Sequence, residues 1–213
     1  MRTFSEDLMK WWSLNKRIFP WRSERDPYRL LVAEVLLHRT KAKGVVTVYE
    51  ELLTQCPDIQ TLADARLKDL KKITKSLGLG WRIKSLKEAA VIVVNEFGGK
   101  VPIQKDKLLS LPGVGDYIAS AIGVFAEKSD SPLIDSNTTR IILRVYGLPL
   151  TDSARRKKDT SIKYEWLRSG FESMEFGFAM IDLASKVCIL TTPRCGICPL
   201  VFHCATGSRL SER

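Results

Sequence analysis

The sequence predicts an all-α protein in two lobes, with a short C-terminal loop that holds a metal centre. Apolar residues recur at three-to-four spacing along most of the 213 residues, as in helices with one buried face. No segment alternates between apolar and polar residues as a half-buried strand does. Four of the five cysteines fall between positions 188 and 204. Together these features predict helices joined by turns and one cysteine-rich loop.

The apolar spacing gives each helix in chain order. Residues Leu62, Leu67, Leu70, Ile73 and Leu77 form one stripe, which we expect to lie in the core. Glycines such as Gly98 separate the periodic segments. The predicted helices cover residues 5–16, 28–39, 44–55, 60–76, 83–97, 105–110, 117–127, 136–147, 161–173 and 176–187.

The charge balance favours a polyanionic partner. The formal net charge is +10, with basic residues spread along the chain and concentrated at 155–158. Nucleic acid is the natural partner of such a chain, although a merely soluble basic protein is the alternative. No apolar run could span a bilayer and the N-terminus lacks a signal-peptide core, so we expect an intracellular, soluble monomer in the cytoplasm or at the nucleoid.

The cysteines predict metal ligation. Their spacing is Cys188-x6-Cys195-x2-Cys198-x5-Cys204, and an intracellular chain would not keep them as disulfides. Three unequal gaps suit a chain that wraps a cubane iron–sulfur cluster, while zinc remains open on spacing alone. Cys56 stands apart and is expected to be a structural thiol.

Residues 105–125 predict a helical hairpin. Leu111-Pro112-Gly113-Val114-Gly115 ends one short helix and begins another. Glycines allow the backbone to approach a neighbouring surface, and the free N–H groups of a helix N-terminus suit a phosphate. An ordinary corner between helices is the alternative.

These residues resemble a known family. The segment from Leu111 to Gly115 is similar to the helix-hairpin-helix of the endonuclease III superfamily of DNA glycosylases, and residues 133–140 resemble its catalytic-aspartate segment. The cysteine spacing is that of its cluster loop. The resemblance implies a two-lobed glycosylase fold with a six-helix domain over 24–127 and a second domain over 1–23 and 128–213. It also implies a [4Fe-4S] cluster on the four cysteines.

The resemblance further implies base flipping and cleavage of the N-glycosidic bond. Asp135 would stabilise the positive sugar, and a helix N-terminus would favour its ionised form. A plain helix cap is the alternative. Lyase members of the family carry a lysine at the position of Tyr117, whose phenol cannot form a Schiff base, so we expect a monofunctional enzyme. Glu34 either faces solvent or sits in a desolvated pocket as a general acid.

DNA containing a mismatched or damaged base is the expected partner. By resemblance, Arg39 fills the hole left by the flipped base or contacts a phosphate, and His38 hydrogen-bonds the base or lines the pocket. DNA contacts are also expected from the hairpin, through Leu111, Gly113, Val114 and Gly115.

Three features favour thymine or uracil opposite guanine as the target. His38-Arg39-Thr40 resembles the mismatch branch, Ser136 replaces the usual glycine of adenine enzymes, and nine residues after Cys204 leave no room for their C-terminal domain. An adenine glycosylase of the MutY type and a non-catalytic, cluster-bearing DNA-binding module are the alternatives. An electron-transfer protein would leave the hairpin unexplained.

Overall fold

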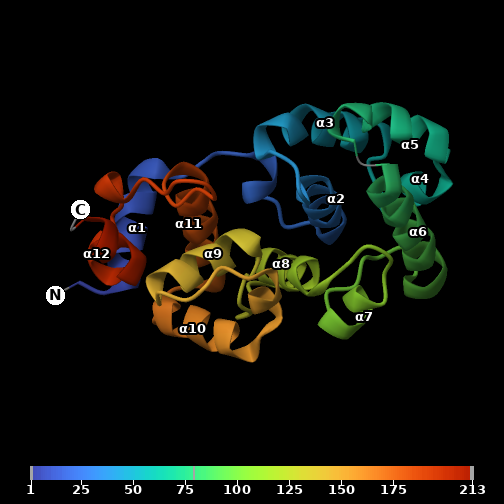
Figure 1. The fold of residues 1–213 in the computed structure, drawn as a ribbon. Helices are drawn as coiled ribbons and strands as arrows, with labels where there is room; N and C mark the ends of the chain where they lie inside the picture. Colours follow the sequence, from blue (N-terminus) through green and yellow to red (C-terminus); the bar gives the residue numbers. More distant parts are fainter. Residues whose placement is uncertain (1, 79, 212–213) are drawn as a thin grey trace. The chain divides into compact units, whose positions relative to one another are not determined.

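In the computed structural model, which describes residues 2–78 and 80–211, helices are joined by short turns and no described residue lies in a strand (Figure 1). This confirms the predicted all-α class. No helix in those two ranges is long and apolar enough to cross a membrane. The helices are α1 (Phe4–Asn15), α2 (Pro27–Leu37), α3 (Ala42–Gln55), α4 (Ile59–Asp64), α5 (Leu67–Ile73), α6 (Gly80–Phe97), α7 (Lys105–Leu109), α8 (Asp116–Glu127), α9 (Ser136–Val145), α10 (Lys158–Arg168), α11 (Ser173–Lys186) and α12 (Ala205–Ser211).

Contacts divide the chain into two compact units. The terminal unit comprises Met1–Arg17 and Asp130–Arg213, and the central unit comprises Ile18–Ser129. The assignment of functional domains to 24–127 and to 1–23 with 128–213 stays a prediction.

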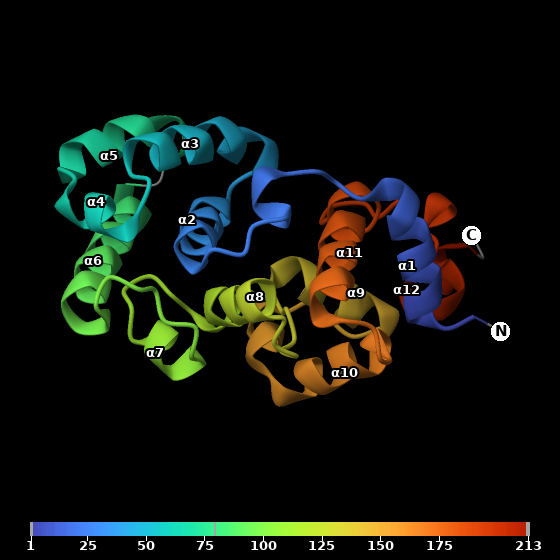
Figure 2. The same ribbon diagram turned by 180° about the vertical axis from the view of Figure 1, so that it is seen from behind.

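The central unit is built around α2. This helix contacts α3, α6 and α8, and its residues from Leu30 to Leu36 are all buried (Figures 1 and 2). A helix that is apolar on every side can be stable in water only when other helices surround it. The Tyr28 hydroxyl donates to the Cys56 carbonyl at 2.6 Å, which ties the start of α2 to the end of α3.

The terminal unit joins segments from both ends of the chain. Helix α1 lies beside α11, and α9 contacts α10, α11 and α12 (Figures 1 and 2). The fully buried carboxylate of Asp182 on α11 accepts hydrogen bonds from the Trp12 indole at 2.9 Å and from the Arg17 backbone at 3.0 Å. The Arg17 guanidinium pairs with the same carboxylate at 2.5 Å. These bonds fasten the N-terminal helix to the rest of the unit.

Several predicted helices were wrong in extent. The helix predicted over 161–173 begins at Lys158 and ends at Arg168, where Ser169 adopts a left-handed conformation with φ 46°. The single helix predicted over 60–76 is broken between α4 and α5, and the Lys87 ammonium of α6 donates to the Ala63 carbonyl at 2.5 Å at the end of α4. A cation there satisfies a terminal carbonyl that would otherwise continue the helix. The helix predicted over 28–39 ends at Leu37, because Arg39 adopts a left-handed conformation with φ 58°. Helix α12 was not predicted.

Candidate functional site

Asp135 is the N-cap of α9, and its carboxylate is held by four donors. One oxygen accepts from the backbone amides of Asn137 at 2.8 Å and Thr138 at 2.7 Å, and from the Thr138 hydroxyl at 3.1 Å. The other oxygen accepts from the Asn137 side-chain amide at 2.7 Å. Asp135 is half-buried, so a carboxylate fixed in direction remains accessible at one end of a helix.

The segment leading to Asp135 packs closely on α11. Leu133 is fully buried, and a Cβ atom added to Gly177 would lie 2.4 Å from the Leu133 side chain. Real Cβ atoms do not approach so closely, so only glycine allows this packing. Gly177 therefore helps to position Asp135, a function that the sequence analysis missed because a glycine inside a helix carries no chemical group.

A hydrogen-bond chain connects Asp135 with the cysteine segment through α9. The Asn137 side chain that donates to Asp135 accepts from the Arg140 guanidinium at 3.1 Å. Arg140 also donates to the carbonyls of Cys188 at 3.0 Å and Ala184 at 3.1 Å. Burial lowers the pKa of the Arg140 guanidinium, which remains a cation because its ordinary pKa is so high. The carboxylate and the first cysteine are thus fastened to one helix.

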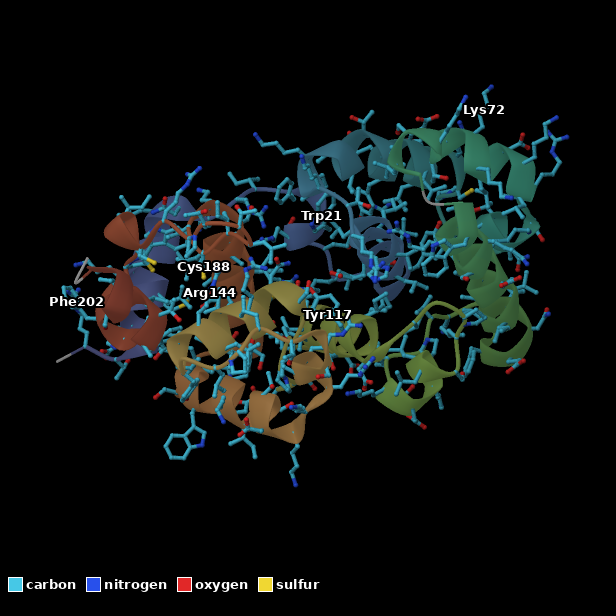
Figure 3. The ribbon with its side chains drawn as sticks, in the orientation of Figure 1. Trp21, Lys72, Tyr117, Arg144, Cys188 and Phe202 are labelled. Atoms are coloured by element: carbon cyan, nitrogen blue, oxygen red, sulfur yellow. The ribbon has the colours of Figure 1, made fainter. Side chains whose placement is uncertain are left out.

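The four cysteines surround a common cavity in the cysteine module, defined as residues 188–207. The cavity is also lined by Arg144 and by Thr206 and Gly207 in the first turn of α12. Figure 3 shows Cys188 and Arg144 next to each other. The lining cysteines are Cys188, Cys195, Cys198 and Cys204.

Arg144 holds this module together. Its guanidinium donates to the carbonyls of Ile189 at 2.7 Å and Leu190 at 3.0 Å, and to the Cys188 sulfur at 3.3 Å. The Gly207 amide donates to the Cys204 sulfur at 3.4 Å. N–H donors directed at sulfur stabilise thiolates and are a common feature of iron–sulfur sites.

The four thiols line the walls of one cavity. Four cysteine thiolates are the donor set that a [4Fe-4S] cluster takes, so the residues present fit such a group. Burial, together with the other cysteines, raises the pKa of the Cys198 thiol to about 11, so ligation would have to displace its proton.

The hairpin lies in the central unit between α7 and α8. Leu111 and Val114 are buried, while Gly113 and Gly115 are exposed. Gly113 has φ 81°, and a Cβ atom there would lie 3.0 Å from the Ser85 Cβ of α6. Gly115 is the N-cap of α8 and offers no side-chain cap, so the first amides of α8 remain directed outward.

The other predicted site residues of the central unit lie on α2, on α8 and just after α2. Glu34 is buried in α2, with 6% of its surface exposed, and Tyr117 is half-buried in the first turn of α8 (Figure 3). His38 caps α2 and meets the Trp81 ring edge to face at 6.3 Å, with Arg39 beside it. The structure thus gathers hairpin, His38 and Arg39 in the central unit, and Asp135 and the cysteines in the terminal unit.

Comparisons with known proteins now give these features a family. A model described as "HhH-GPD superfamily base excision DNA repair protein" matches residues 32–165. The chain belongs to this superfamily. It is therefore a DNA glycosylase of base excision repair, with DNA as its substrate, and the predicted family is confirmed.

Relatives extend over nearly the whole chain. A thymine/uracil-DNA glycosylase of Pyrobaculum aerophilum is 37% identical over 99% of this chain and 94% of its own length. A thymine-DNA glycosylase of Aeropyrum pernix is 39% identical over 92% and 91%. The solved structure of a thermostable thymine-DNA glycosylase has a TM-score of 0.88 at 29% identity and covers 97% of this chain and 95% of its own.

Proposed function

We propose that this HhH-GPD glycosylase flips thymine or uracil out of a pair with guanine and hydrolyses its N-glycosidic bond. The observation that carries the proposal is its similarity, at 37% and 39% identity over nearly full length, to enzymes named for thymine or uracil. The capped carboxylate of Asp135 supports the reaction type. Removal of such bases begins the repair of sites where 5-methylcytosine or cytosine has lost its amino group.

Asp135 is the proposed catalytic carboxylate. As the base departs, positive charge develops on the sugar, and a fixed negative group nearby lowers the energy of that state. The four hydrogen bonds to Asp135 hold the carboxylate in one orientation before the reaction. Little reorganisation is then required when the charge appears.

The residues of the central unit are proposed to hold the DNA and the flipped base. The exposed glycines of the hairpin, Gly113 and Gly115, allow backbone amides to reach a phosphate, with Leu111 and Val114 anchoring the turn. His38 and Arg39 are proposed to contact the DNA near the flipped base. The buried carboxylate of Glu34 suits a general acid that protonates the departing base.

Tyr117 supports a hydrolytic rather than a lyase mechanism. A Schiff base requires a neutral amine, and a phenol at this position of α8 cannot supply one. Water is therefore the proposed nucleophile, and the product is an abasic site in an unbroken strand. Borohydride reduction during turnover should trap no covalent protein–DNA adduct.

We infer that Cys188, Cys195, Cys198 and Cys204 hold a [4Fe-4S] cluster, since they line one cavity together with N–H donors directed at sulfur. When bound, the cluster supplies four iron–thiolate crosslinks within the module. Arg144 and Arg140 connect the cysteine module to α9, and α9 connects it to Asp135.

An oligonucleotide panel tests the proposed specificity. Duplexes that pair T, U or A with guanine, and A with 8-oxoguanine, are incubated with the enzyme and then heated in alkali to cut abasic sites. We expect cutting at T and U opposite guanine. Cutting confined to A opposite 8-oxoguanine would instead assign the chain to the adenine branch, a second candidate supported by 32% identity to an adenine DNA glycosylase of Mycolicibacterium smegmatis over 93% of this chain.

A further inference from the structure

A half-buried cation without an acceptor lies on the first turn of α6. The Nε and Nη1 atoms of Arg82 are shielded from solvent and have no hydrogen-bond partner within the described part of the chain. A guanidinium that loses water without gaining an acceptor destabilises the folded state. Such a group can take its acceptor from outside the chain, and an anionic ligand is one source.

The surroundings of Arg82 are positive. Burial and the nearby charge of Arg39 both lower the pKa of the Arg82 guanidinium. Neither arginine forms a salt bridge with a described residue. Arg39 itself holds a left-handed backbone at φ 58°, which residues other than glycine rarely adopt. Two cations placed together without an anion suit a negatively charged ligand.

Aromatic rings complete one side of this site. The Arg82 guanidinium carbon lies 5.8 Å from the centre of the Trp81 ring, which also meets His38 edge to face. Trp81 is 61% exposed. At this distance the ring attracts the cation, which favours a position of the Arg82 side chain next to Trp81.

The same helix connects Arg82 with the hairpin. Ser85 follows Arg82 by three positions, so both lie on one face of α6, and Ser85 is the residue against which Gly113 packs. The N-terminal end of this 18-residue helix adds partial positive charge beside Arg82. The unpartnered cation therefore borders the turn already proposed to bind DNA.

We propose that Arg82, in the positive field of Arg39, binds a phosphate of the DNA backbone next to the hairpin. The proposal rests on the proposed function, because the ligand is the duplex that carries the target base. A phosphate fits better than a base edge, since neighbouring cations favour a full negative charge over the neutral acceptors of guanine. Arg82 thus acts in positioning the duplex and takes no part in bond cleavage.

The experiment measures duplex affinity over a series of KCl concentrations for Arg82→Gln, Arg82→Lys and wild type. A fully matched duplex and a T·G duplex are used, the latter with Asp135→Asn in every protein to prevent turnover. The matched control is Lys72→Gln, which removes the same charge from an exposed position on α5 (Figure 3). Circular dichroism and melting without DNA accompany each variant.

We expect Arg82→Gln to reduce the affinity for both duplexes about tenfold. It should also lower the slope of log Kd against log salt by about 0.9, the contribution of one phosphate. Arg82→Lys should keep the slope and lose part of the affinity, since an ammonium retains charge but not the fork of donors. Lys72→Gln should change affinity by no more than about twofold. Without DNA, Arg82→Gln should melt no lower than wild type, because it removes an uncompensated buried charge.

An unchanged salt slope in Arg82→Gln would overturn the proposal. Reduced affinity for only one of the two duplexes would overturn it as well, because that result indicates that Arg82 contacts a base. A clearly lower melting temperature without DNA would assign Arg82 to folding and overturn it too. Excision and duplex binding are separate measurements. If wild type excises neither T nor U yet the slope changes as expected, the proposed function fails and this inference stands.

Discussion

Asp135 serves the helix that it begins as well as the reaction proposed for it. Its carboxylate satisfies the amides of Asn137 and Thr138, while the Thr138 hydroxyl donates to the same oxygen and accepts from the Asp135 amide. Capping residues of this kind typically contribute about 1 kcal/mol to stability. A test of catalysis therefore requires a substitution at Asp135 that keeps the helix cap and removes the negative charge.

Asp135→Asn makes that separation. Asparagine caps helices about as well as aspartate, so the melting temperature should fall by only a few degrees, while loss of the negative charge should lower the excision rate at least about 100-fold. Single-turnover kinetics and thermal unfolding measure the two effects. Asp58→Asn is the matched control, since Asp58 caps α4 with the same reciprocal pattern through Thr61. Equal losses of activity in both variants would contradict a catalytic function of Asp135.

Sequence alone could identify Asp135 as a cap and the cysteines as a group, because both depend on spacing along the chain. It could not find Arg140 or Arg144, whose partners lie 44 to 48 positions away. An arginine on a helix has the same appearance in the sequence whether it faces solvent or, as here, is buried against carbonyls. For Arg82 no acceptor lies within residues 2–78 and 80–211, and only the folded structure reveals that its guanidinium is unpaired.

At the scale of elements, the two glycines of the hairpin have different structural functions. Gly113 has a positive φ and approaches Ser85, whereas Gly115 has φ −103° and nothing within 4 Å of a Cβ atom added there. Gly113 is therefore required by the fold of the turn. The fold of the turn does not require glycine at 115. The missing side chain of Gly115 instead allows DNA to approach the backbone closely.

The variants Gly113→Ala and Gly115→Ala should differ accordingly. Alanine at 113 is strained by its backbone and should cost about 1–2 kcal/mol of unfolding free energy, with the contact to Ser85 adding to the loss. Alanine at 115 should change stability by less than about 0.5 kcal/mol but weaken duplex binding. Urea unfolding and DNA titration measure both. Unchanged DNA affinity in Gly115→Ala would argue against close backbone approach at that turn.

Arg144 is the corresponding element-scale connection in the terminal unit. Arg144→Met should cost about 2–4 kcal/mol, because it leaves the carbonyls of Ile189 and Leu190 without donors. The purified variant should also contain less iron and show weaker thiolate-to-iron absorbance. Arg168→Met is the control, since Arg168 binds Asp130 and Glu165 away from the cysteines. Normal iron content in Arg144→Met would refute its function in holding the module.

The break between α4 and α5 shows why the ends of helices could not be predicted from the sequence. No proline or glycine interrupts residues 60–76, and Leu62 and Leu70 keep helical spacing on both sides. The helix ends where the backbones of Ala65 and Arg66 are extended, with ψ 142° and 130°, and Lys87 of α6 donates to a carbonyl of α4 beside this break. Local propensity favours one helix here, and it does not register a contact with a residue 24 positions away.

At the scale of the whole molecule, the helical class and the family followed from patterns that run through the entire sequence. The net charge of +10 was also sufficient to suggest a polyanion. Three acidic groups contribute to stability through the hydrogen bonds that they accept. Hydrogen bonds lower the pKa of Asp7 (from His203), Asp58 (from Thr61) and Asp130 (from Arg168) below the usual 3.8.

This arrangement predicts acid sensitivity. A carboxyl whose pKa is lower in the folded chain stabilises the fold above its unfolded pKa, and that contribution is lost as pH falls through the folded value. The melting temperature should therefore decline below about pH 4. The triple variant Asp7→Asn, Asp58→Asn, Asp130→Asn should have a lower melting temperature than wild type at pH 6. Its melting temperature should then fall less than that of wild type as the pH is lowered. An equally steep decline in the triple variant would show that other groups govern acid unfolding.

The amides of Asn137 and Thr138 have a spectroscopic consequence. Both protons point at the Asp135 carboxylate, so their nuclear magnetic resonance frequencies depend on whether that group is charged. A ¹⁵N-labelled sample would thus report on the surroundings of the Asp135 carboxylate through two assigned peaks, with no DNA present. Adding a duplex would then show, through the same two peaks, whether the substrate changes the charge of the carboxylate before any bond is broken.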